Sequence, residues 1–168
     1  MTANTKRNTP LDQDIPHHGT FDLTDVAEGN ALTAVAQALN TLRYGQVLLV
    51  LGNAPGLESD LFSWADHTNN QILAVNRTLP AGLGFYLLKG DPWPVDVTLD
   101  TRSAPCPTPV VLGSRRLASM HSGQHLRLAT ACHAAVGEVD AWLRHTRHRL
   151  LGITEDARGV YRFYIRKT

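Results

Sequence analysis

The sequence has only two cysteines in 168 residues, Cys106 and Cys132, too few for the disulfide framework of a small secreted domain. It also lacks any apolar run near the roughly 20 residues that a membrane-spanning helix needs. Residues 1–7 are polar and no apolar stretch follows them, so we expect no signal peptide. These absences predict a cytoplasmic protein with reduced thiols and no membrane association.

Net charge is close to zero, at +1, but the two halves of the chain differ in charge. Residues 1–96 carry 5 Lys/Arg against 10 Asp/Glu, whereas residues 97–168 carry 11 against 5. The basic half suits an acidic partner or a nucleic acid, or it simply packs against the acidic half. Because we see no stacking platform of interleaved aromatic residues, we expect no direct readout of bases, and tRNA would take part only indirectly. The candidate arginines for binding such a partner are Arg115, Arg116, Arg144, Arg147, Arg149, Arg158, Arg162 and Arg166.

Residues 1–19 are polar and show no periodicity, which predicts a flexible tail. After the tail, apolar residues recur first at helical spacing and then in short continuous runs typical of buried strands. The predicted order is a strand at 21–23, a helix over 32–42, a strand at 46–51, a helix over 57–65 and strands at 72–75 and 85–88. This βαβαββ order predicts one small domain over residues 20–89.

The same pattern returns 78 residues later without a gap. Identical residues fall mainly at element ends and core positions, as expected if both halves share a fold. The identical pairs include Asp22/Asp100, Leu39/Leu117, Gly45/Gly123, Gln46/Gln124, Leu48/Leu126, Trp64/Trp142, His67/His145, Thr68/Thr146, Leu73/Leu151, Phe85/Phe163, Tyr86/Tyr164 and Lys89/Lys167. We therefore predict an internal duplication, with tandem domains at 20–89 and 96–168 and a semi-rigid proline-containing linker at 90–95.

Cys106 lies among three prolines, just before a helical pattern over residues 110–120. Proline is favoured at the first helical position, which puts Cys106 at or near the helix N-cap. The positive end of the helix dipole and free backbone N–H groups there would lower the pKa of the thiol and favour an exposed thiolate. The first half has Glu28 at the equivalent position, so the fold does not need the cysteine. We infer that Cys106 is near the surface and does chemistry that the first domain cannot perform.

The second half resembles the TusA (SirA-like) sulfur-carrier family over residues 96–168. The most specific part is Leu99-Asp100-x-Arg102-x-x-x-Cys106-Pro107-x-Pro109. Further matching residues are Leu117, Gly123-Gln124, Trp142, His148-x-Leu150 and Tyr161 to Lys167. Ser103 departs from the family, which usually has glycine after the arginine. Residues 20–89 resemble the same fold without its cysteine.

The resemblance implies both a fold and a role. The fold is a two-layer α/β sandwich, with two helices on a four-stranded mixed sheet, so the chain would be α+β with two such sandwiches in tandem. Cys106 would carry sulfane sulfur as a persulfide, taken from a desulfurase or rhodanese-type donor and passed to an acceptor protein. Arg102, Pro107 and Pro109 would support that cysteine. No metal or organic cofactor is implied.

Three alternatives accompany this interpretation. The duplicated fold could serve as a non-enzymatic regulatory or adaptor module, because fold alone does not fix function. Cys106 and Cys132 could form a redox dithiol if their Cα atoms lie within about 7 Å, although Cys132 is more simply a small buried residue in place of Ala54. His145 and His148 are spaced for zinc only if both lie in a helix, so a metal site is the weakest of the three.

Overall fold

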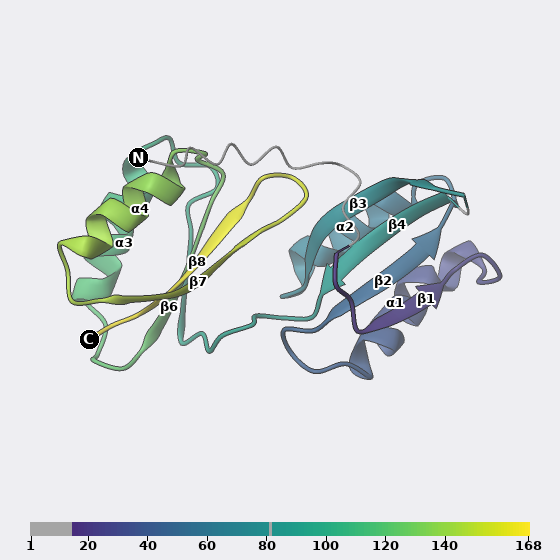
Figure 1. The fold of residues 1–168 in the computed structure, drawn as a ribbon, viewed down its shortest axis with the longest axis horizontal. Helices are drawn as coiled ribbons and strands as arrows, with labels where there is room; N and C mark the ends of the chain where they lie inside the picture. The colour runs from purple at the N-terminus through teal and green to yellow at the C-terminus, as the bar shows by residue number, and fades with distance from the viewer. Residues whose placement is uncertain (1–14, 81) are drawn as a thin grey trace, which may run out of the picture. The chain divides into compact units, whose positions relative to one another are not determined.

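The structure is a computed structural model that describes residues 15–80 and 82–168 (Figure 1). The chain divides into two compact units, Met1–Gly90 and Asp91–Thr168. Residues 1–14 of the predicted tail lie outside the described residues. No helix among the described residues is long and apolar enough to cross a membrane.

The first unit alternates strands and helices before closing with a hairpin. Its elements are β1 (Gly19–Asp22), the short 3-10 helix η1 (Glu28–Asn30), α1 (Ala31–Asn40), β2 (Val47–Gly52), α2 (Leu57–His67), β3 (Gln71–Leu79) and β4 (Gly82–Leu88). The hairpin strands are longer than the sequence pattern predicts. Leu79 pairs with Gly82 next to the turn, and glycine is required there because its φ is +119°.

The second unit repeats this order. Its elements are β5 (Val97–Asp100), α3 (Thr108–Ala118), β6 (His125–Thr130), α4 (Ala135–Arg144), β7 (Arg149–Glu155) and β8 (Tyr161–Arg166). The helix predicted over 110–120 begins two residues earlier. Pro109 fits in its first turn because a missing N–H costs no hydrogen bond there.

Both sheets are mixed, with strand orders β1-β2-β4-β3 and β5-β6-β8-β7. The edge pairs β1–β2 and β5–β6 are parallel, and the remaining pairs are antiparallel. Register repeats as well, since Leu48 pairs with Leu87 and Leu126 pairs with Ile165, each 78 residues later. The predicted fold class, two α+β sandwiches in tandem, is confirmed.

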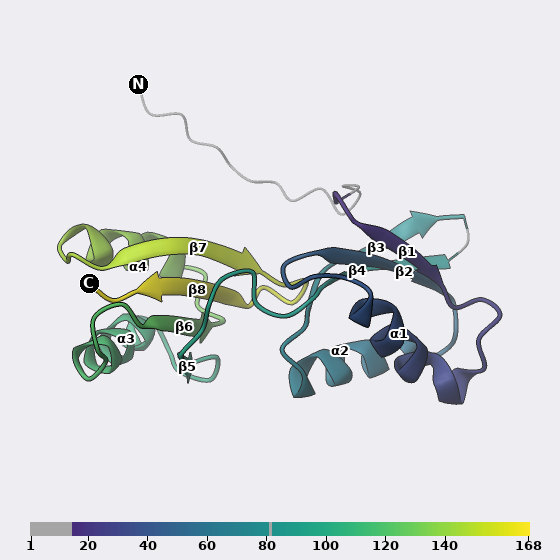
Figure 2. The ribbon, with the colours of Figure 1, turned by 90° about the horizontal axis from the view of Figure 1, so that it is seen from below.

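Each core lies between the helices and one face of the sheet, as Figure 2 shows clearly for α1 and α2. Leu39 and Phe85 are fully buried in the first unit, and their counterparts Leu117 and Phe163 are fully buried in the second. Burying a large apolar side chain contributes roughly 1.5–3 kcal/mol. Matching core positions therefore explain why two halves that differ at the positions of Cys106 and Cys132 keep one fold.

The segment before β5 packs on its own unit. The Trp93 ring packs against that of Tyr164 with the ring centroids 5.0 Å apart and the planes tilted by 46°, and it lies close to the backbone of Gly152. Asp91, nearly buried, binds the Arg127 guanidinium at 2.6 Å and accepts a hydrogen bond of 2.8 Å from the Tyr164 hydroxyl. Asp91 and Trp93 thus attach this segment to the second unit.

Candidate functional site

The loop between β5 and α3 carries Cys106 on the surface of the second unit. Its backbone turns at Thr101, whose carbonyl accepts the N–H of Ala104 at 3.0 Å. Cys106 is exposed, and the Cys106–Pro107 peptide bond is cis. Among the described residues only glycines have positive φ, so Ser103 fits the loop without the backbone freedom of glycine.

The start of α3 lies next to Cys106, as predicted, but the N–H groups expected to be free are bonded. Pro107 is the N-cap, which places Cys106 one residue outside the helix. The N–H of Thr108 donates to Pro105, the N–H of Val110 donates to Pro107, and Pro109 has none to donate. The expected free N–H groups are therefore engaged locally at these positions, and the helix dipole is the remaining contribution to the environment of Cys106.

Arg102 is oriented by Asp100, at the end of β5. The guanidinium Nη2 lies 2.7 Å from Asp100 Oδ2, and Nε lies 3.0 Å from both carboxylate oxygens. The backbone N–H of Arg102 also donates to Asp100. These bonds hold the pKa of Asp100 below its usual range. The bonds between Arg102 and Asp100 thus fix the backbone where the loop that carries Cys106 begins.

Cys132 lies at the start of the loop between β6 and α4 and is bonded to Cys106 by a disulfide. Their Cα atoms are 5.9 Å apart, within the usual range for a disulfide. The prediction of reduced thiols is therefore wrong for this form of the chain. Cys132 is buried in the core, as a small apolar residue would be, but it is also the partner of Cys106.

Two buried threonines near the cysteines were not predicted from the sequence. Thr101 is buried and donates its hydroxyl to the Ala129 carbonyl at 2.8 Å. Thr130 is fully buried and accepts the N–H of Cys132 at 3.0 Å. Comparing the two halves at the 78-residue offset could have indicated them, because the first half has the apolar or small residues Leu23 and Gly52 where the second has these threonines.

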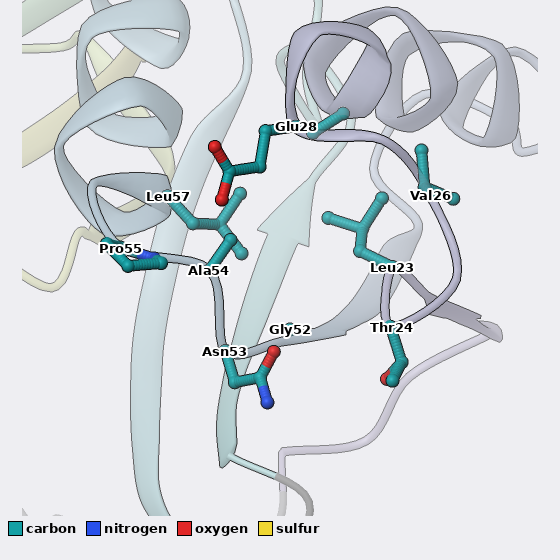
Figure 3. Close-up of a pocket in the computed structure, with 10 residues that line it drawn as sticks. Leu23, Thr24, Val26, Glu28, Gly52, Asn53, Ala54, Pro55 and Leu57 are labelled. Carbon is teal, nitrogen blue, oxygen red and sulfur yellow. The ribbon is translucent and has the colours of Figure 1, made fainter.

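The equivalent place in the first unit is a cavity of about 260 Å³ (Figure 3). Glu28 and Ala54, the counterparts of Cys106 and Cys132, both line it. Figure 3 shows the Glu28 carboxylate pointing across the cavity toward the start of α2. The first unit therefore has a pocket and no thiol at the place that the disulfide occupies in the second unit.

Comparison with known proteins bears on the second unit. The family model described as "Sulfurtransferase TusA" matches residues 97–167. A Halobacterium salinarum protein named "Putative sulfur carrier protein" is 31% identical over 71 residues, covering 42% of this chain and 88% of that protein. The chain belongs to the TusA family.

A second relative is much longer than the part of it that matches this chain. The Bacillus subtilis "Putative sulfur carrier protein YrkF" is 28% identical over 71 residues, which cover 42% of this chain and 38% of that protein. The chain thus spans less than half of that relative's length. The family model matches the unit that holds Cys106, as the resemblance predicts.

Metal ligands do not gather at the site. Among residues 15–80 and 82–168, no group of three or more His, Cys, Asp and Glu side chains is arranged to hold a metal ion. His145 lies just beyond the end of α4 and His148 lies three residues farther on, so the two do not share a helix face.

Proposed function

We propose that this TusA-family chain is a sulfur carrier that holds sulfane sulfur as a persulfide on Cys106. The observation that carries the proposal is the exposed position of Cys106, on a loop fixed by Asp100 and Arg102 in the unit that matches the family. A donor protein must bring its own persulfide to this sulfur, so exposure is a requirement of the reaction. The donor would be a desulfurase or a rhodanese-type protein.

The loading reaction is a thiolate displacement. The Cys106 thiolate attacks the outer sulfur of the donor persulfide, a new S–S bond forms, and the donor leaves as a thiolate. The positive end of α3 would favour the anionic forms of Cys106 before and after transfer. Pro107 and Pro109 would support the step by fixing where the helix begins, while Arg102 would hold the loop. An acceptor protein would then attack the carried sulfur, and neither step needs a metal or an organic cofactor.

The disulfide sets a condition on this function. Cys106 bonded to Cys132 has no thiolate, so the carrier must be reduced before it loads. A reducing compartment such as the cytoplasm would supply that condition. The first unit, which has Glu28 in place of the cysteine, would contribute a docking surface rather than a second sulfur site.

Loading can be tested on a variant that holds Cys106 alone. Cys132→Ala uses the residue that the first unit already carries at this position, Ala54, so the fold is expected to tolerate it. After incubation with a cysteine desulfurase and cysteine, its intact mass should rise by about 32 Da, one sulfur atom, on the peptide that contains Cys106. The double variant Cys106→Ala/Cys132→Ala should gain nothing. An unmodified Cys132→Ala protein would favour the adaptor alternative instead.

A further inference from the structure

Cys132 is placed to do more than pack the core of the second unit. It follows β6, whereas Cys106 follows β5, and these parallel neighbours end at the same edge of the sheet. The two sulfurs reach bonding contact with Cα atoms 5.9 Å apart. The fold itself does not require this bond, because the first unit builds the same sheet with Glu28 and Ala54 at these positions.

The two cysteines differ sharply in access. Cys106 is exposed, while Cys132 is only 7% exposed and packs with the core cluster of the second unit. The Thr130 hydroxyl accepts the Cys132 N–H and fixes its backbone. A donor protein can therefore reach Cys106 but not Cys132, whereas Cys132 can reach the inner sulfur of a group carried on Cys106.

We propose that Cys132 discharges the persulfide on Cys106 and releases its sulfur as sulfide. This inference rests on the proposed function, because it needs a loaded Cys106. It adds a second outcome to sulfur transfer, in which the carried sulfur leaves as a small inorganic product rather than on an acceptor protein.

The reaction balances within the chain. Cys132 loses its proton to solvent, and its thiolate attacks Sγ of Cys106. The Cys132–Cys106 bond forms as the bond from Cys106 to the outer sulfur breaks, and the electron pair leaves with that sulfur as hydrosulfide. The outer sulfur is reduced by two electrons, and the Cys132 sulfur and the Cys106 sulfur end as the disulfide. Because Cys106 faces solvent, the hydrosulfide has a direct way out.

The disulfide in the structure is then the product state of this step. A dithiol reductant must open it before the next load, so the class of reaction that regenerates the carrier is dithiol–disulfide exchange. This places the chain between a persulfide donor, which supplies the sulfur, and a dithiol, which supplies the two electrons.

The test is a single turnover without air. Reduced wild-type chain, freed of reductant, receives sulfur from a desulfurase with cysteine, beside Cys132→Ala, Cys106→Ala and a sample without cysteine. The wild type should release about one equivalent of sulfide per chain and lose both free thiols, and Cys132→Ala should keep its adduct and release sulfide at least about tenfold more slowly. The sample without cysteine should keep both thiols.

The outcomes separate the two proposals. If wild type keeps its added sulfur as long as Cys132→Ala does, the discharge step is overturned while the carrier function stands. If Cys132→Ala takes no sulfur, the carrier function fails first. If Cys106→Ala releases as much sulfide as wild type, sulfide arises elsewhere and the discharge step is overturned.

Discussion

Cys106 follows β5, Cys132 follows its parallel neighbour β6, and the two form a disulfide with Cα atoms 5.9 Å apart. One lies on the surface and the other in the core. This relationship joins the exposed cysteine of the unit that matches the TusA family to a buried cysteine within bonding reach of it. The availability of Cys106 therefore depends on the redox state of the chain.

The pair of Asp100 and Arg102 should contribute to stability in a pH-dependent way. The pKa of Asp100 is lowered in the folded state, so the ionised carboxylate stabilises the fold above its unfolded pKa of about 3.9. That contribution is lost as pH falls through the lower folded pKa. Both side chains are partly exposed, so Arg102→Ala should lower the free energy of unfolding by less than about 1 kcal/mol at pH 7.

Urea unfolding of wild type and Arg102→Ala at successively lower pH measures this effect. The difference between the two proteins should shrink as Asp100 becomes protonated. A difference that grows toward acid would show that another group is responsible.

The packing of Trp93 on the second unit depends on Gly152. A Cβ atom at this position would lie closer than 3.0 Å to three atoms of the rigid indole ring. Gly152→Ala should therefore displace Trp93 and lower the free energy of unfolding by about 1–3 kcal/mol. Hydrogen exchange in β8 read by mass spectrometry reports this loss for the second unit alone.

Gly137→Ala is the matched control. A Cβ atom at Gly137, within α4, meets nothing within 4 Å. Alanine should raise helix stability there by up to about 1 kcal/mol. If Gly152→Ala behaved like Gly137→Ala, the close packing of Trp93 would be refuted.

Much of the fold could be predicted because the same pattern of apolar residues occurs in both halves of the chain. Apolar positions such as Leu39 and Leu117 recur at the 78-residue offset and face equivalent cores. Element ends were harder to predict, since they depend on pairing and local turns. The β3–β4 hairpin extends to Leu79 and Gly82, and α3 begins at Thr108 because Pro109 suits a first helical turn.

The site was predicted less completely. The three prolines around Cys106 and the Glu28 at the equivalent position of the first half indicate Cys106 as the candidate site residue. No local pattern around Cys132 indicates that it pairs with Cys106. That contact arises from the parallel pairing of β5 and β6, which brings two distant loops to one edge of the sheet. The Cys132 backbone is held by Thr130, whose role depends on burial that a single sequence does not display.

The most direct measurement of the central claim is sulfur uptake by the wild-type chain before and after reduction. The disulfide form and the reduced form, both freed of reductant, are given the same desulfurase labelled with radioactive sulfane sulfur. The account predicts that the reduced chain withdraws about one equivalent of label, recovered on Cys106 or as sulfide, while the disulfide form withdraws none. Equal withdrawal by both forms would contradict it.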